Sequence, residues 1–348
     1  MPVSALRDVA EIPALGPADP DQGLVPRPAT SDRRFRAGQD GVVSVHATGD
    51  GKVELVVFHG AEGGHTLAHV TSALGYPAYY PLHPVSLRRP VKAVLMDLDG
   101  TSVHSEPFWV WIIEQTTASL LGDPGFKLEP ADQPYVSGHS VSEHLQYCID
   151  KYCPGATVED TRRHYFEHAQ REMKWIMEGR GRTDAFVPAP RLKEFLLGLK
   201  ARGIKIALVT SGLYEKAYPE ILAAFRTLGL GDPKAFYDAI ITAGFPLRRG
   251  EAGTLGELSP KPHPWLYAEA ARVGLGIPFE ERESVIGIED SGAGVCAIRL
   301  AGFVTVGLEG GNIRESGTRA LCGFMARDLG EALELILGGD APLRMGRR

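Results

Sequence analysis

Five short apolar segments constrain the fold of this chain more than any other feature of its sequence. These segments span residues 91–96, 204–209, 239–242, 284–288 and 303–308. Each has the length and apolar character of a buried strand in a parallel sheet. Apolar residues at helical spacing, such as those of 192–199, lie between several of them. Alternating strands and helices imply right-handed crossovers, so the sequence predicts an α/β fold with a doubly wound parallel sheet.

A long insertion interrupts this alternation between the first two predicted strands. Residues 103–195 contain apolar residues at helical spacing, among them Phe108, Trp111 and Ile112. We expect this segment to form a helical cap that is inserted into the sheet domain. This leaves residues 91–102 and 196–338 for the parallel core.

The two ends of the chain lie outside the α/β pattern. Residues 1–40 are rich in proline and lack an apolar period, which predicts a disordered tail. Residues 41–90 contain alternating valines around Asp50-Gly51, which is typical of a hairpin, and residues 66–74 are expected to form a short helix. We therefore predict a small α+β module with a linker there, and a C-terminal tail over residues 339–348.

Composition and charge exclude several classes of protein. Lys and Arg number 37 against 43 Asp and Glu, a net charge of −6, whereas nucleic-acid-binding proteins usually carry a basic balance. No apolar run approaches the roughly 18 residues of a membrane helix, and the N-terminus lacks the apolar core of a signal peptide. The four cysteines are too sparse for a disulfide framework, so we expect reduced thiols in a cytoplasmic protein. The amino-acid sequence indicates no particular oligomeric state.

Acidic residues follow two of the predicted strands. The segment Asp97-Leu-Asp99-Gly-Thr101 ends the first strand, and Glu289-Asp290 ends the fourth. Ligands of open α/β sheets bind outside the carboxyl ends of strands, and residues spaced two apart on an extended chain face the same side. Taken alone, Asp-x-Asp-Gly is equally a turn or a fragment of a calcium-binding loop. Together with Glu289 and Asp290, it indicates a hard cation held by oxygen ligands.

Hydroxyl and basic residues are expected near the same strand ends. Thr210, Ser211 and Gly212 end the second strand, where hydroxyls and free backbone N–H groups form a phosphate-binding loop or, equally, the N-cap of a helix. Lys261 lies between prolines just before a predicted helix, so a stiff loop holds its ammonium. A lysine held in this way balances charge on phosphate and carboxylate groups.

These four segments, in this order, resemble the motifs of the haloacid dehalogenase-like (HAD) hydrolase superfamily. The matching stretches are Asp97-Leu-Asp99-Gly-Thr101, Thr210-Ser-Gly212, Lys261-Pro-His-Pro264 and Gly287-Ile-Glu-Asp-Ser-Gly-Ala-Gly294. The stretch Thr101–Pro107 is similar to the opening of the branch with a helical cap, which includes phosphoglycolate phosphatase-like and β-phosphoglucomutase-like enzymes. The resemblance covers Val91 to about Leu337 and does not include the N-terminal module.

The resemblance implies a role for each acidic residue. Asp97 is expected to be the nucleophile that forms an aspartyl-phosphate, which divides one difficult displacement into two easier ones. Asp99 is expected to protonate the leaving oxygen and then to deprotonate the attacking water. The resemblance also implies Mg²⁺, bound by the carboxylates of Asp97 and Asp290 and the carbonyl oxygen of Asp99, with Glu289 reaching it directly or through water.

The remaining motifs are expected to contact the phosphoryl group. By the same resemblance, Lys261 and Mg²⁺ neutralise the phosphoryl oxygens, and Thr210, Ser211 and Gly212 bind the group during transfer. These contacts prevent the repulsion that two anions would otherwise exert on each other.

The predicted cap carries candidates for substrate recognition. These candidates are His104, Gly138, His139 and Ser140. His104 stands where the family usually has aspartate, and its alternative interpretation is a tolerated substitution at a linker. The loop of residues 245–259 either closes over substrate or is a surface excursion.

Single residues favour one reaction of the family. Asp99 fits phosphate esters, whose leaving group needs a proton. The β-phosphoglucomutase-like enzymes carry arginine where this chain has Val141, and histidine about where it has Trp109. We therefore predict a Mg²⁺-dependent phosphatase for a small phosphorylated metabolite such as a sugar phosphate. A phosphosugar mutase and a non-catalytic sensor of a phosphorylated ligand are the alternatives.

Overall fold

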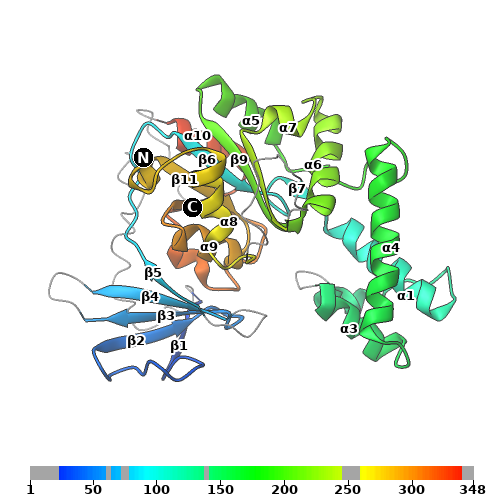
Figure 1. Ribbon diagram of the computed structural model, residues 1–348, viewed down its shortest axis with the longest axis horizontal. Coiled ribbons are helices and arrows are strands. Elements are labelled where there is room, and N and C mark those ends of the chain that lie inside the picture. Colours follow the sequence, from blue (N-terminus) through cyan, green and yellow to red (C-terminus); the bar gives the residue numbers. More distant parts are fainter. Residues whose placement is uncertain (1–22, 60–63, 72–77, 137–140, 245–258, 339–348) are drawn as a thin grey trace, which may run out of the picture. The chain divides into compact units, whose positions relative to one another are not determined.

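The computed structural model describes residues 23–59, 64–71, 78–136, 141–244 and 259–338. Contacts divide the chain into two compact units (Figure 1). Among the described helices, none is both long enough and apolar enough to cross a membrane. The first unit consists of Met1–Ser102, Ala189–Tyr214 and Lys234–Arg348, and the second of Val103–Pro188 and Glu215–Pro233.

The first unit contains a six-stranded sheet in the order β10-β9-β6-β11-β12-β13, and all neighbouring strands are parallel. Its strands are β6 (Ala93–Asp97), β9 (Lys205–Leu213), β10 (Ala239–Gly244), β11 (Val285–Glu289), β12 (Val304–Leu308) and β13 (Phe324–Ala326). The first five confirm the strands predicted from the apolar segments, and the parallel pairing confirms the doubly wound α/β prediction. The sequence does not reveal β13, because three residues at a sheet edge are too few to form a pattern.

The strand order creates a topological switch point between β6 and β11. From β6 the chain continues to β9 and β10 on one side, and it then returns to β11 on the other side of β6. Ligands of open α/β sheets bind outside the carboxyl ends of strands at such a point. Asp97 and Glu289 are the last residues of β6 and β11. The topology therefore brings these two acidic residues to the edge of the sheet where a ligand is expected.

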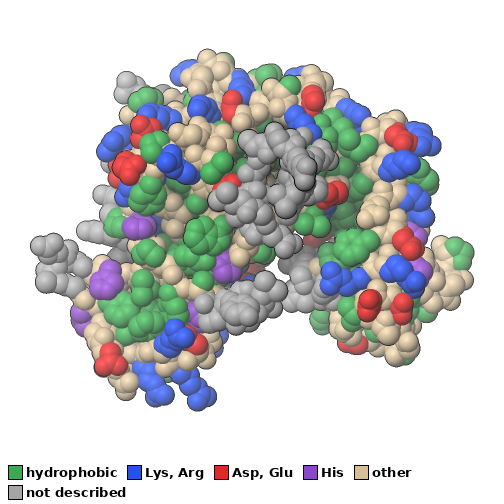
Figure 2. All heavy atoms as spheres, viewed as in Figure 1, with side chains coloured by type: hydrophobic (Ala, Val, Ile, Leu, Met, Phe, Trp, Pro, Cys, Tyr) green, Lys and Arg blue, Asp and Glu red, His purple; other side chains and the backbone are tan. Residues whose placement is uncertain are grey.

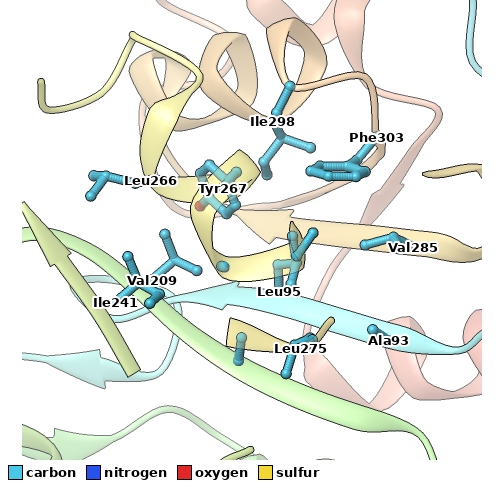
Figure 3. Close-up of a cluster of buried hydrophobic side chains, with 14 of the residues drawn as sticks. Ala93, Leu95, Val209, Ile241, Leu266, Tyr267, Leu275, Val285, Ile298 and Phe303 are labelled. Carbon is cyan, nitrogen blue, oxygen red and sulfur yellow. The ribbon is translucent and has the colours of Figure 1, made fainter. Parts of the chain in front are cut away.

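Helices cover both faces of the parallel sheet. On one face, sheet residues such as Leu95 and Val209 share a buried cluster with Tyr267 and Ile298 (Figure 3). On the other face, α5 and α10 pack so closely that a methyl group at Gly198 would lie 2.8 Å from the side chain of Leu333. The helices of this unit are α5 (Leu192–Ala201), α7 (Pro233–Phe236), α8 (Trp265–Glu269) with a π-helical turn over Ala270–Gly274, α9 (Gly292–Leu300) and α10 (Leu329–Leu337).

A five-stranded antiparallel sheet precedes the parallel sheet in the same unit. Its strands lie in chain order, and they are β1 (Val25–Arg27), β2 (Val42–Ala47), β3 (Val53–Phe58), β4 (His65–Val70) and β5 (Ala78–Leu82). The hairpin of β2 and β3 confirms the predicted turn at Asp50-Gly51. The helix predicted over 66–74 is wrong, because residues 66–70 belong to β4 and residues 72–74 lie outside the described chain. Pairing with β3 and β5 on both sides outweighs the local helical pattern of this short segment.

The prediction of disorder over residues 1–40 is wrong for residues 23–40, and residues 1–22 lie outside the described chain. The segment contains β1, which pairs with β2, and a bridge between Ala29 and Arg36. Pro26 is compatible with a strand here because β1 lies at the edge of its sheet. A proline-rich composition therefore does not exclude edge pairing.

The two faces of the N-terminal sheet have different surroundings. On one face, Leu55 shares a buried cluster with Val295 and Leu300 of α9, so the sheet packs on the parallel-sheet domain. On the other face, Phe35 lies edge-on to Phe58 with ring centroids 5.5 Å apart. Figure 2 shows hydrophobic side chains gathered on this part of the molecule.

The second unit confirms the helical segment predicted after the first strand. It also contains most of α6, which lies outside the predicted cap of residues 103–195. Its elements are β7 (Val103–His104), α1 (Glu106–Leu121), α2 (Gln133–Val136), α3 (Val141–Tyr152), α4 (Val158–Met177), β8 (Val187–Pro188) and α6 (Tyr214–Leu228), whose first residue belongs to the first unit.

A buried carboxylate, Asp132, organises part of the second unit. Its oxygens accept hydrogen bonds from the hydroxyl groups of Tyr147, at 2.5 Å, and Tyr152. They also accept from Lys151 Nζ at 2.6 Å and from the backbone N–H of Glu129 at 2.8 Å. A carboxylate with this many donors is well compensated for the loss of water.

Candidate active site

Three carboxylates meet at the carboxyl edge of β6 and β11. Asp97 ends β6, Glu289 ends β11, and Asp290 follows directly. The parallel pairing of Met96 with Ile288 sets the two strand ends side by side. One oxygen of each carboxylate lies within 4.8 Å of the others, and Asp97 and Glu289 are buried. The acidic residues that the sequence placed at two strand ends therefore form one cluster.

Lys261 brings a positive charge into this cluster from the loop before α8. Its Nζ donates to Asp97 Oδ1 and to Glu289 Oε1, the latter at 2.5 Å. Only 7% of the Lys261 side chain is exposed, so both ion pairs are shielded from water. The backbone N–H of Lys261 donates to Ser211 Oγ at 3.1 Å. The lysine, the carboxylates and the hydroxyl segment thus lie at the same edge of the sheet.

Glu289 is held by donors on both of its oxygens. Tyr267 donates its hydroxyl to Oε1 at 2.9 Å, beside Lys261, while Ser291 donates to Oε2 from its backbone at 3.1 Å and from its hydroxyl at 2.9 Å. A Cβ at Gly294 would lie 1.8 Å from Oε1, so glycine is required there. The sequence analysis missed Tyr267 and Ser291. The helix-capping position of Ser291 is a local signal, whereas nothing near Tyr267 in the sequence links it to Glu289.

Two glycines allow close approach to Asp290. Gly100 has a φ of 84°, and a Cβ there would lie 2.2 Å from Asp290 Oδ2. A Cβ at Gly311 would lie 2.1 Å from the carbonyl oxygen of Asp290. Larger side chains at these positions would displace the carboxylate, so the glycines shape the floor of the site. Thr101 Oγ1 donates a weak hydrogen bond to Asp290 Oδ1 at 3.4 Å.

The cluster carries more negative than positive charge. Burial raises the pKa of Asp97 well above its usual range, and the charges of Glu289 and Asp290 raise it further against the opposing effect of Lys261. Burial and Glu289 likewise raise the pKa of Asp290, to about 7. Burial alone lowers the pKa of Lys261, but the charges of Asp97 and Glu289 outweigh it and raise that pKa. One lysine therefore does not neutralise three adjacent carboxylates.

The donor set fits Mg²⁺. The ion prefers oxygen ligands and binds proteins through one or two carboxylates, keeping several waters. Asp97 and Asp290 offer such carboxylates at the sheet edge, and their raised pKa values show that a further positive charge is favourable there. Both oxygens of Glu289 are already engaged by protein donors. The carboxylates of Asp97 and Asp290 are therefore the better candidates for ligands.

The hydroxyl segment lies on β9 itself. This strand continues through Leu213 and α6 begins at Tyr214, so the alternative that Ser211 is a helix N-cap is wrong. Thr210 is buried, and its Oγ1 accepts from the backbone N–H of Gly212 at 2.9 Å. Ser211 is exposed beside the loop that carries Lys261, which leaves its surroundings accessible to a ligand.

Of the other predicted site residues, the structure describes two, Asp99 and His104. Asp99 is partly buried and follows Asp97 by two residues. His104 is exposed in β7 of the second unit. The remaining cap candidates and most of the long loop lie outside the described residues, namely Gly138, His139, Ser140 and residues 245–258.

The fold and the cluster define an α/β protein with a group of charged residues at the switch point of its sheet. A family model described as a haloacid dehalogenase-like hydrolase matches residues 91–302, which is more than half of the chain. The chain therefore belongs to the haloacid dehalogenase-like hydrolase family. The matched segment contains β6, β9 and β11, and so it contains all the residues of the cluster.

Several solved structures resemble the chain at low sequence identity. A predicted phosphoglycolate phosphatase from Haemophilus somnus has a TM-score of 0.50 at 20% identity, over 70% of this chain and 97% of that one. CbbY from Rhodobacter sphaeroides, solved in complex with phosphate, has a TM-score of 0.49 at 20% identity, over 69% of this chain and 96% of that one. A putative β-phosphoglucomutase from Thermotoga maritima has a TM-score of 0.48 at 20% identity, over 70% of this chain and 96% of that one. Comparison with curated protein sequences gives no match.

Proposed function

We propose that the chain is a Mg²⁺-dependent phosphatase that hydrolyses a small phosphomonoester through an aspartyl-phosphate. One observation carries the proposal. At the switch point of the sheet, Asp97 lies in a cluster of carboxylates and is paired with Lys261, whose backbone N–H donates to the hydroxyl of Ser211. A buried carboxylate beside a fixed cation is suited to attack on an anionic phosphoryl group, which also needs neutralising charge.

Asp97 and Asp99 divide the chemistry between them in this proposal. An oxygen of Asp97 attacks phosphorus, the bond from phosphorus to the leaving oxygen breaks, and Asp99 gives that oxygen a proton. Asp99 then removes a proton from water, which attacks the phosphorus of the aspartyl-phosphate and restores the Asp97 carboxylate. The spacing of two residues beyond the end of β6 supports the assignment, because both side chains lie at the same strand end.

Lys261 stabilises the charge of the phosphoryl group during both steps. Its Nζ is fixed by Asp97 and Glu289, and Glu289 is itself fixed by Tyr267 and Ser291. A preorganised cation in a water-poor site stabilises developing charge without having to rearrange during the reaction. We propose that Glu289 positions Lys261, while the hydroxyls of the Thr210-Ser211-Gly212 segment contact the phosphoryl oxygens.

We propose that Mg²⁺ is bound by the carboxylates of Asp97 and Asp290 and the carbonyl oxygen of Asp99. When bound, the ion supplies positive charge that screens the phosphoryl group from these carboxylates. Its binding also offsets the excess negative charge that raises the pKa values of Asp97 and Asp290.

Two residues of the second unit support hydrolysis rather than mutase chemistry. Trp109 Nε1 donates to Glu220 Oε1 at 2.8 Å, and an indole N–H does not act as a general base. Val141, at the start of α3, offers no charge for the second phosphate of a bisphosphate intermediate. We therefore propose a small phosphorylated metabolite with water as the final acceptor.

The thiols of the chain support a reducing compartment. All four cysteines are free, and three of them are buried. Disulfides persist in oxidising compartments and are rare in the cytoplasm. We propose that the enzyme works in the cytoplasm.

The test is release of inorganic phosphate from a panel of phosphomonoesters, with MgCl₂ and with excess EDTA. Asp97→Asn serves as the blank, and circular dichroism confirms that it is folded. We expect turnover that needs Mg²⁺ and is absent from the variant. Phosphate release by Asp97→Asn at the wild-type rate would contradict the proposal. Transfer of phosphate between positions of one sugar without its release would show a mutase instead.

A further inference from the structure

The loop that carries Lys261 has an anchor outside the family domain. Two residues after Lys261, the imidazole Nδ1 of His263 forms a hydrogen bond with the hydroxyl of Tyr80 at 2.8 Å. Tyr80 belongs to β5 of the N-terminal sheet, whereas the family match begins at residue 91. Tyr80 also lies edge-on to Trp265, with ring centroids 5.9 Å apart. A residue of the additional sheet thus reaches the lysine loop of the family domain.

The contact is local and part-buried. His263 is 6% exposed, and burial lowers its pKa, so the imidazole is neutral near neutral pH. Its backbone N–H donates to the carbonyl oxygen of Pro260 at 3.1 Å, which closes the turn around Lys261. The same residue therefore closes the turn with its backbone and contacts Tyr80 with its ring. Losing the bond to Tyr80 leaves a polar atom of the buried His263 ring without its hydroxyl partner.

The N-terminal sheet also reaches this loop at a second point. Pro262, which directly follows Lys261, lines a small cavity together with Thr48 and Val53 of the N-terminal module and Cys296 of α9. Pro262 thus lies near both the N-terminal module and α9.

We propose that Tyr80 is a positioning residue for Lys261 and that it acts through His263. This inference rests on the proposed function of the Lys261 site. A lysine has a long flexible stem, and its backbone must be fixed before its ammonium is placed reproducibly. The N-terminal sheet supplies part of that fixation, which gives this otherwise unassigned module a role in the phosphate site. Misplacing a catalytic group by about 1 Å costs up to about 100-fold in rate.

The test compares two neighbouring tyrosines of β5. Tyr80→Phe removes the hydroxyl that contacts His263 and keeps the ring. Tyr79→Phe is the matched control, because the Tyr79 hydroxyl donates to Asp32 at 2.6 Å within the N-terminal module. We measure kcat and KM on the best ester of the panel, the Kd for inorganic phosphate by calorimetry in MgCl₂, and the Tm of each variant.

Tyr80→Phe is expected to lower kcat/KM about 5–10-fold, as for the loss of one hydrogen bond, and to raise the Kd for phosphate in proportion. Tyr79→Phe is expected to lower Tm while kcat/KM and Kd stay within about twofold of wild type. A general loss of module stability would affect both variants alike, so equal falls in their kcat/KM would overturn the proposal. Wild-type values for Tyr80→Phe would overturn it as well.

Variants of His263 test the route of the effect. His263→Ala removes the partner of Tyr80, whereas His263→Asn keeps a polar atom near the position of Nδ1. We expect His263→Asn to retain more kcat/KM than His263→Ala, and Tyr80→Phe to add nothing in the His263→Ala background. Additive losses in the double variant would show that Tyr80 does not act through His263.

The phosphate titration separates this inference from the proposed function. If no ester is hydrolysed but wild type binds phosphate, the phosphatase proposal fails, and the Kd values of Tyr80→Phe and Tyr79→Phe still decide the inference. If wild type neither hydrolyses an ester nor binds phosphate, both fail. Weaker phosphate binding by Tyr80→Phe alone supports the inference in either case.

Discussion

Each unit has a cluster of polar side chains built on buried carboxylates, Asp97 and Glu289 in one and Asp132 in the other, and the two clusters differ in the balance of their charges. At the edge of the parallel sheet, burial and neighbouring carboxylates raise the pKa values of Asp97 and Asp290. In the helical unit, burial alone would raise the pKa of Asp132, but hydrogen bonds from Lys151, two tyrosines and a backbone N–H lower it well below its usual range. The neighbours of these aspartates therefore shift their pKa values in opposite directions in the two units.

We propose that this difference in charge balance separates a structural carboxylate, Asp132, from functional ones at the sheet edge. Asp132 has its donors within the unit, so its charged form is stabilised without any ligand. The sheet-edge cluster has one lysine for three carboxylates, and we propose that a bound cation completes its charge balance. An unbalanced buried cluster costs stability, and such sites concentrate where binding or catalysis requires them.

The largest expected effect is on turnover. Asp97→Asn keeps the shape of the side chain but removes the nucleophile, so we expect at least about a 1,000-fold loss of kcat. Because it also removes one of the mutually repelling charges, Tm without Mg²⁺ should stay the same or rise. Activity assays and thermal unfolding of the same preparation check both parts. A large fall in Tm would show that Asp97 is structural, like Asp132.

The next effect is on stability alone. Asp132→Asn leaves Lys151 and the hydroxyls of Tyr147 and Tyr152 without a carboxylate partner, so we expect the free energy of unfolding to fall by about 2–3 kcal/mol. Urea unfolding measures it. Asp150→Asn is the control on α3, the helix that carries Tyr147 and Lys151, because Asp150 is exposed and accepts only a surface hydrogen bond from Gln146 among the described contacts. Equal stability of the Asp132 and Asp150 variants would remove the contrast between the clusters.

Mg²⁺ should stabilise only one of the two clusters. At a concentration about 100 times its Kd, a ligand specific for the folded state adds about 2.7 kcal/mol. We expect Mg²⁺ to raise the Tm of wild type and of Asp132→Asn, but to have little effect on Asp290→Asn. Thermal unfolding with MgCl₂ and with EDTA tests this. An undiminished shift in Asp290→Asn would place the ion elsewhere.

The smallest effect concerns pH. The folded-state pKa of Asp132 lies below its unfolded value of about 4. Between these two pKa values the unfolded chain binds more protons than the folded chain. The contribution of the Asp132 carboxylate to folding stability is therefore complete above about pH 4, and it is lost as the pH falls through the folded-state pKa. The stability difference between wild type and Asp132→Asn should therefore shrink in acid, as measured by urea unfolding at several pH values. A difference that grows in acid would reverse the sign of the shift.

Much of the fold and the candidate site is predictable from the sequence because their signals are local. The apolar runs that predict β6, β9 and β11 are continuous, and the polar segments that follow them end at the sheet edge. Strand order is a consequence of crossover topology, so residues far apart in sequence, such as Asp97 and Glu289, are predicted to converge without any pair-specific signal.

The features that escape prediction depend on distant partners. β4 forms because β3 and β5 pair with it on both sides, although its own residues also fit a helix. The hydroxyl of Tyr267 reaches Glu289 across 22 residues, and that of Tyr80 reaches His263 across 183. No spacing rule connects such pairs, because the intervening chain, rather than the local pattern, sets the distance between them.

The central claim is that Asp97 attacks phosphorus. The most direct measurement is to quench the enzyme in acid during turnover of the best ester with MgCl₂, reduce any acyl phosphate with borohydride, and map the modified peptide by mass spectrometry. Our account predicts conversion of Asp97 to homoserine in wild type, dependent on substrate and absent from Asp97→Asn. Turnover with an unmodified Asp97, or reduction at another aspartate, would contradict it.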